Sequence, residues 1–130
     1  MNSDYSCYVE IHNNTNQDIK LTSSNNNHGN YTNPPPPLIE AGIARGFILE
    51  GTNWGPFGYG ADGDCTYQFT VNGKTYTYKF SYRCPHLAND NSIGVEMTDT
   101  NVQSVIVYPD PVPTSGHPLN ITIMLNPLKL

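Results

Sequence analysis

The segment from Cys65 to Pro85 constrains the fold more than any other part of the chain. It consists of two runs in which apolar and polar residues alternate, separated only by Asn72 and Gly73. Asn-Gly between alternating runs is the strongest short-range signal for a β-hairpin, because both residues of a type I′ turn need a positive φ angle. A two-residue turn also fixes the pairing of the flanking strands. We therefore expect Phe69 to face Tyr76.

This register gives the hairpin two faces of opposite character. One face is aromatic and apolar, and the other consists of Thr66, Gln68, Thr70, Thr75, Thr77 and Lys79. The register and the alternation are independent signals, and they agree. The hairpin therefore predicts an antiparallel sheet with one buried face.

The remaining strand signals are short runs with no sustained helical periodicity. We expect strands within residues 5–11, 19–21, 46–49, 93–97, 102–108 and 119–125. With the two hairpin strands this makes about eight, and short strands at such spacing are typical of a sandwich or barrel. The prediction is an all-β fold, a single-domain antiparallel β-sandwich of about eight strands spanning residues 1–130.

Three long loops are expected between these strands. The first, residues 22–37, joins an Asn-rich patch to four consecutive prolines, which favour polyproline II and exclude a helix. The second, residues 51–64, is rich in glycine and holds the only Trp, and the third, residues 109–118, is rich in proline. Binding residues are common on such loops.

Composition and charge exclude several classes of partner. The net charge is −5, only 13% of residues are charged, and the six Lys and Arg are scattered. Nucleic-acid binding depends on clustered basic residues, so we expect no nucleic-acid partner. No apolar run approaches the roughly 20 residues of a membrane helix. Residues 1–5 lack the basic and apolar regions of a signal peptide, so we expect cytoplasmic synthesis without one.

The three cysteines are expected to be free thiols. In the predicted register Cys84 lies four residues beyond the partner of Cys65, which is about 13 Å along the strand at ~3.4 Å per residue. A disulfide requires Cα atoms within about 7 Å of each other. A Cys65–Cys84 disulfide is therefore not expected, and free thiols fit a reducing compartment.

The patterns that suggest catalysis or metal binding lack the spacing, ligands or neighbouring elements that such sites require. Residues 58–63 spell G-x-G-x-x-G, but the dinucleotide fingerprint needs a helix after it, and here a strand is expected. Asp62 and Asp64 lack the further oxygen ligands of an EF-hand loop. The Cys and His spacings match no zinc pattern, and adjacency of Cys84 and His86 is no evidence of a catalytic pair. We expect a protein that is not an enzyme, with no metal and no cofactor.

An aromatic cluster in the loops is the strongest candidate for a binding site. Trp54, Phe57 and Tyr59 lie among the glycines of the second long loop, and Tyr31 lies in the first. Such residues either plug the end of the core or form an exposed aromatic lip. Trp and Tyr suit a bilayer interface, with an apolar ring and a polar atom, and they equally suit stacking on sugar rings. The residues alone leave these alternatives open.

Four segments add a family resemblance. They are an opening strand with an Asn-rich turn (residues 9–21), a His-Gly-Asn-Tyr loop (28–31), a Gly-rich run (50–64) and Phe-Ser-Tyr-Arg-Cys-Pro-His (80–86). In this order they resemble the aegerolysins, small one-domain β-sandwich proteins of fungi and bacteria that bind membrane lipids. The resemblance spans nearly the whole chain.

The last of these segments departs from the family pattern, aromatic-aromatic-Asp-Cys-Pro-Trp, at three positions. Tyr82 stands where the family has Trp, Arg83 where it has Asp, and His86 where it has Trp. The resemblance implies lipid contacts at these positions. With the loop aromatics, the expected lipid- or ligand-binding residues are Tyr31, Trp54, Phe57, Tyr59, Tyr82, Arg83 and His86.

The function implied by the resemblance is recognition of a membrane lipid without catalysis. It further implies a hemolysin-like or pore-forming component that acts with a larger partner of the membrane-attack type, released from the cell and associated with membranes. One alternative is a carbohydrate-binding lectin that uses similar loops. A second is a structural or storage protein, which the Asn-rich, weakly charged surface permits.

Overall fold

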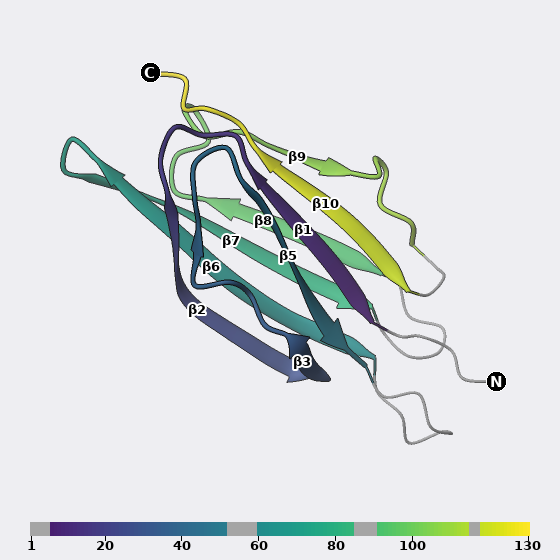
Figure 1. Ribbon diagram of the computed structural model, residues 1–130. Coiled ribbons are helices and arrows are strands. Elements are labelled where there is room, and N and C mark those ends of the chain that lie inside the picture. Colours follow the sequence, from purple (N-terminus) through teal and green to yellow (C-terminus); the bar gives the residue numbers. More distant parts are fainter. Residues whose placement is uncertain (1–5, 52–59, 85–90, 115–117) are drawn as a thin grey trace.

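The computed structural model describes residues 6–51, 60–84, 91–114 and 118–130. In this part of the chain two five-stranded sheets pack face to face as a sandwich (Figure 1). Sheet A has the order β3 (Asn30–Asn33), β5 (Ala44–Glu50), β1 (Cys7–Asn13), β10 (Leu119–Leu125) and β9 (Val105–Tyr108). Sheet B has the order β4 (Leu38–Ile39), β2 (Ile19–His28), β6 (Ala61–Val71), β7 (Lys74–Cys84) and β8 (Ser92–Met97).

The hairpin prediction is confirmed. Phe69 pairs with Tyr76, and the φ angles of Asn72 and Gly73 are 52° and 78°, as a type I′ turn requires. The hairpin is longer than expected, because β6 already begins at Ala61. Residues 61–64, expected in a loop, therefore belong to a strand.

The core lies between the two sheets and follows the alternation of the sequence. Every second residue of β1, β6, β7 and β10 is buried, except Val71 and Lys74 beside the turn at residues 72–73. The aromatic face of the hairpin packs toward sheet A, where the rings of Phe47 and Tyr82 lie 5.2 Å apart. The largest fully buried side chains include Tyr67, Tyr78, Tyr82, Phe47 and Phe80. The predicted all-β sandwich is confirmed, and two interleaved apolar faces form its core.

The described chain contains ten strands, and the additional ones lie where a loop was expected. β2 continues to His28, and β3 and β4 also fall within or just after residues 22–37. Asn and Ser are poor strand formers, so the pattern carried no strand signal. The strand forms because β6 offers its backbone as a partner, and two bulges adjust the register of β2. At the turn between β2 and β3, Gly29 has φ 94°, and a Cβ there would lie 2.6 Å from Glu50 O.

One pairing departs from a purely antiparallel sandwich. β1 and β10, at opposite ends of the chain, run parallel, with Cys7 opposite Leu119. The alternation within a strand predicts which face is buried but carries no information on strand direction. The described residues contain no helix long and apolar enough to cross a bilayer.

The predicted free thiols are confirmed: Cys7, Cys65 and Cys84 are buried and not disulfide-bonded. Ala61 is the partner of Cys84 and Phe80 that of Cys65, as the register argument requires. The structure adds one contact that local sequence could not reveal. The thiols of Cys7 and Cys84 are hydrogen-bonded between the two sheets, and this bond together with burial raises the pKa of Cys7.

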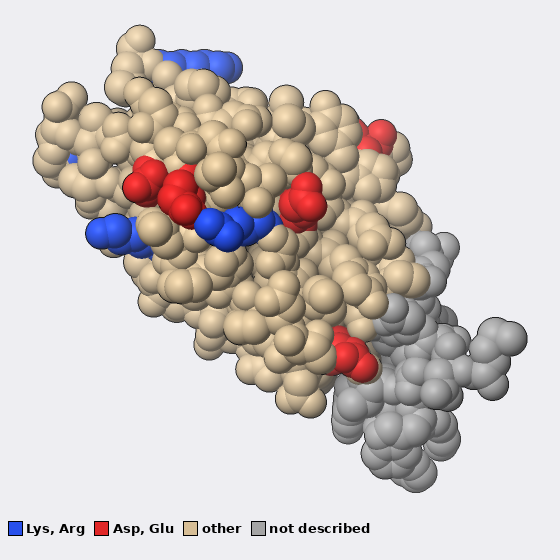
Figure 2. All heavy atoms as spheres, in the orientation of Figure 1, with Lys and Arg blue, Asp and Glu red and all other residues tan. Residues whose placement is uncertain are grey.

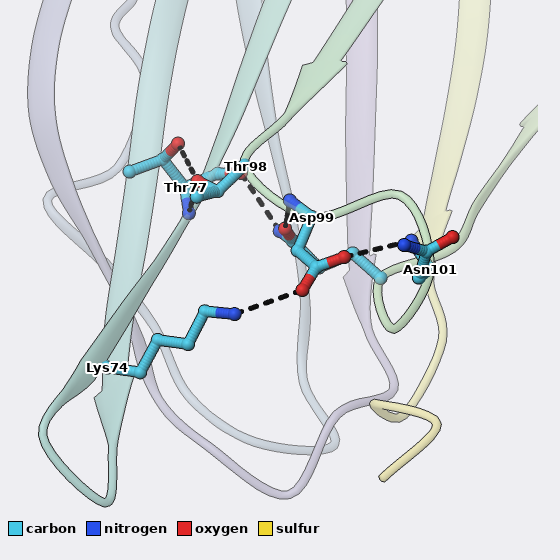
Figure 3. Close-up of polar contacts among 6 residues, drawn as sticks. Lys74, Thr77, Thr98, Asp99 and Asn101 are labelled. Atoms are coloured by element: carbon cyan, nitrogen blue, oxygen red, sulfur yellow. Dashed lines mark hydrogen bonds and ion pairs between the residues drawn. The ribbon is translucent and has the colours of Figure 1, made fainter.

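The end of the sandwich that carries the turn at residues 72–73 is called the hairpin end below. Lys74 Nζ lies 3.0 Å from Asp99 Oδ2, and Asn101 N donates a 3.0 Å hydrogen bond to Asp99 Oδ1 (Figure 3). The hydrogen bond from Lys74 lowers the pKa of Asp99. One carboxylate thus closes the turn after β8 and ties it to the start of β7.

Candidate functional site

The opposite end of the sandwich, called the loop end, gathers the termini of four strands. β5 ends at Glu50, β6 begins at Ala61, β7 ends at Cys84 and β8 begins at Ser92. Ala61 pairs with Cys84, and Arg83 pairs with Ser92. The chain segments after β5 and after β7 therefore leave from the same end of the molecule.

These two segments carry most of the residues expected to bind a ligand. Trp54, Phe57, Tyr59 and His86 lie outside the described residues. Tyr31 is described, and it lies on β3 opposite Leu49, next to the pair formed by Asn30 and Glu50. The structure therefore brings Tyr31 to the same end as the strand termini that flank the other predicted residues.

Tyr31 bridges the two sheets at this end. Its hydroxyl donates a 2.8 Å hydrogen bond to Asn25 O on β2, and it also contacts the hydroxyl of Tyr82 on β7. Its ring lies edge-on to Phe47, with 6.4 Å between the ring centroids. Burial raises the pKa of Tyr31 to about 12, although the bond to Tyr82 opposes the rise. The neutral phenol therefore dominates at ordinary pH.

A glycine makes room for this bridge. A Cβ on Gly63 would overlap Asn25 O and would lie 3.1 Å from the Tyr31 hydroxyl. Deeper in the core, the Tyr82 hydroxyl is hydrogen-bonded to the Cys65 thiol, and burial raises the pKa of Cys65 to about 12. Contacting polar groups thus lead from the Cys65 thiol in the core, through the hydroxyls of Tyr82 and Tyr31, to Asn25 O at the loop end.

The structure corrects the role expected for Tyr82. Only 1% of its surface is exposed, and its ring packs against Phe47 inside the sandwich. Tyr82 occupies an inward-facing position in the alternation of β7, as the hairpin register requires. It is therefore not a surface anchor but the buried support of Tyr31.

Arg83 is the next residue and faces the other way. It is exposed on the outer face of sheet B, between Asp62 on β6 and Ser92 on β8. Nearby, Asn25 Nδ2 donates a 3.0 Å hydrogen bond to Asp64 Oδ1. The outer face of sheet B at the loop end, called the rim below, thus carries the guanidinium group of Arg83, the carboxylates of Asp62 and Asp64, and amide groups such as that of Asn25. These groups lie beside the strand termini from which the two segments leave.

Asn25, Asp62 and Asp64 were missed as rim residues, for two different reasons. Nothing in the local pattern placed Asn25 on a strand, so its pairing with Asp64 had no signal. The sequence pattern indicates the two Asp residues only as possible cation ligands in a loop. The described residues contain no group of three or more His, Cys, Asp or Glu side chains placed to hold a metal ion.

Comparisons with known proteins support the fold. No protein-family model and no curated protein matches the chain. IP-1A from Alcaligenes faecalis has a similar structure, with a TM-score of 0.68 and 16% identity over 96% of this chain and 91% of that one. The lipid binding protein Nakanori has a TM-score of 0.65 and 14% identity over 97% of this chain and 71% of its own. At these identities the likeness shows a shared fold.

Proposed function

We propose that this protein binds a membrane lipid, without catalysis, through the loop end of the sandwich. The observation that carries the proposal is the convergence at that end. Tyr31, Arg83 and the strand termini that flank Trp54, Phe57, Tyr59 and His86 all lie there. The fold shared with Nakanori, described as a lipid binding protein, supports the proposal.

In the proposed mechanism, the rim recognises the head of the lipid and the loop aromatics enter the headgroup region. Trp and Tyr rings are favourable there because they combine apolar area with one polar atom. The Arg83 guanidinium suits a phosphate group, and Asn side chains suit neutral polar atoms. Tyr82, held between the sheets, fixes the Tyr31 hydroxyl and so keeps β3 against β2 and β7.

The charge of the protein narrows the lipid class. A net charge of −5 opposes approach to anionic membranes, so we infer a zwitterionic or neutral headgroup. Following the aegerolysin resemblance, we further propose that pore formation requires a larger partner of the membrane-attack type. The protein itself then acts at a membrane surface.

Sedimentation with vesicles tests this proposal. The vesicles contain phosphatidylcholine alone, or phosphatidylcholine mixed with phosphatidylethanolamine, sphingomyelin or phosphatidylserine. We expect binding to at least one zwitterionic composition and weaker binding to phosphatidylserine. Arg83→Gln is expected to weaken binding several-fold, because it removes the cation at the rim.

Lys79→Gln is the matched control, since Lys79 is also exposed on β7 but lies four residues from Arg83, toward the hairpin end. Equal losses in the two variants would show a general charge effect rather than a site at the loop end. No sedimentation with any of the four compositions would overturn the proposal.

A further inference from the structure

A shallow groove of about 310 Å³ lies on the outer face of sheet A, apart from the buried Tyr31–Tyr82 bridge. Its walls are formed by the side chains of Tyr8, Glu10, Asn33, Ile48, Asn120 and Thr122, and Gly46 lies at its floor. Figure 2 shows that most of the described surface on the face drawn there carries no charged side chain, and that several charged side chains gather in one band across its middle. The side chains that form the walls of the groove are mostly polar, and Glu10 is the one charged residue among them.

The strand register explains the hollow. Glu10 on β1 lies between Gly46 on β5 and Thr122 on β10, and all three positions face outward. Neighbours in such a row stand about 4.5–5.5 Å apart, so the missing side chain of Gly46 leaves a gap beside Glu10. Asn33 Nδ2 donates a 3.2 Å hydrogen bond to Gly46 O and forms the far wall.

No positive φ angle requires a glycine at this position. Positive φ angles occur at Gly29, Gly42 and Gly73 but not at Gly46. A Cβ on Gly46 would have one close neighbour, Val9 O at 3.3 Å, a tight contact that a shift of a few tenths of an ångström would relieve. Glycine also weakens a strand relative to other residues. Glycine at this position therefore avoids a tight contact with Val9 O and also leaves an open space on the outer face of sheet A.

The chemistry of the walls selects one class of ligand. Asn33, Asn120 and Thr122 each donate and accept hydrogen bonds, and the carboxylate of Glu10 accepts them. The His12 ring contacts Glu10 and restrains that carboxylate. The residues that line the groove include no Lys or Arg to balance an anion. A ligand rich in hydroxyl groups satisfies this set, because each hydroxyl both donates and accepts.

We propose that the groove binds one neutral hexose unit. The Tyr8 ring provides an apolar surface for the C–H face of the sugar, and the amides, Thr122 and Glu10 provide partners for its hydroxyls. The volume lies at the lower limit of small-molecule sites, roughly 300–1,000 Å³, which suits a single ring. This site is additional to the proposed lipid site and uses different residues. The sugar belongs either to a free glycan or to the headgroup of a glycolipid.

Saturation-transfer NMR tests the groove with four methyl glycosides: glucoside, galactoside, mannoside and N-acetylglucosaminide. We expect at least one to bind in the millimolar range that a ligand of this size allows. Gly46→Val fills the hollow and is expected to weaken binding more than tenfold. Gly94→Val is its control, because Gly94 also lies on a strand and a Cβ there would meet only Ser81 Cβ, at 3.6 Å.

A second pair of variants tests the groove with substitutions that conserve shape, so that a loss of binding cannot come from misfolding. Thr122→Val removes one hydroxyl from the groove at constant shape, and Thr66→Val makes the same change on the outer face of sheet B. We expect weaker binding in the first variant only, with near-ultraviolet circular dichroism unchanged in both. Binding that survives Gly46→Val and Thr122→Val would overturn the proposal.

Vesicles distinguish the two sources of the sugar. Phosphatidylcholine vesicles with and without galactosylceramide or glucosylceramide are compared, using the parent protein and Gly46→Val. Binding of a soluble glycoside that is lost in Gly46→Val supports a free glycan. Extra binding to glycolipid vesicles alone, lost in the same variant, supports a glycolipid headgroup. A parent protein that binds no glycoside, and binds glycolipid vesicles no better than plain ones, overturns the hexose site but leaves the phospholipid proposal untouched.

Discussion

The two ends of the sandwich are built in different ways. At the hairpin end, Asn72 and Gly73 close a two-residue turn, and Lys74 reaches Asp99 in the turn after β8. At the loop end, Tyr31 is held by residues 6 positions and 51 positions away in sequence, Asn25 and Tyr82. The hairpin end is closed by short turns. The loop end depends on contacts between the two sheets, and the segments after β5 and β7 leave from it. Stability and ligand recognition are therefore expected to respond differently at the two ends.

The largest effect is expected from Tyr82→Ala. Tyr82 is 1% exposed and supports both Phe47 and Tyr31, so its removal leaves a cavity in the core. Burial of an aromatic of this kind is worth roughly 3–5 kcal/mol of unfolding free energy. Urea denaturation measures the loss. A loss below about 1 kcal/mol would show that Tyr82 is a surface residue after all and that the loop end lacks a rigid base.

The contacts of Tyr82 also separate the features of the fold that the sequence could predict from those that it could not. The hairpin, its register and its buried face were predictable, because Asn-Gly and the alternation are local signals. The bridge from Tyr31 to Tyr82 was not, since β3 lies in a stretch with weak strand propensity and its partners come from distant segments. The parallel β1–β10 pair and the Cys7–Cys84 contact were also missed, because each joins segments that are far apart in the sequence.

At the hairpin end we expect a smaller loss from Gly73→Val. Gly73 has φ 78°, and a β-branched residue in that region should cost on the order of 1–2 kcal/mol. A Cβ at this position meets no atom within 4 Å, so the cost comes from the backbone and not from a clash. Thermal unfolding provides the measurement. An unchanged melting temperature would contradict the positive-φ turn on which the hairpin register rests.

A pH-dependent effect is expected from the Tyr31 bridge. Its pKa rises from the ordinary value of 10.0 to about 12 in the fold, so the folded state holds the phenolic proton more tightly than the unfolded chain. The stability linked to this group is complete below about pH 10 and is lost as the pH rises toward 12. Tyr31→Phe removes the titrating hydroxyl and its contacts with Asn25 O and the Tyr82 hydroxyl, at a cost of about 1 kcal/mol near neutral pH.

Urea unfolding at pH 8 and pH 11 separates these contributions. The parent is expected to lose more stability between the two pH values than Tyr31→Phe does. Identical losses in both proteins would mean that the Tyr31 hydroxyl is already exposed to water, and the bridge would then not stabilise the loop end.

The emission of Trp54 tests the lipid proposal most directly, because Trp54 is the only Trp in the chain. The measurement adds vesicles of a composition that sediments with the protein, prepared with and without brominated acyl chains. If the loop end meets the bilayer, the emission shifts to the blue and brominated lipid quenches it. Unchanged, unquenched emission from protein that is bound to the vesicles would place the contact elsewhere and contradict the account.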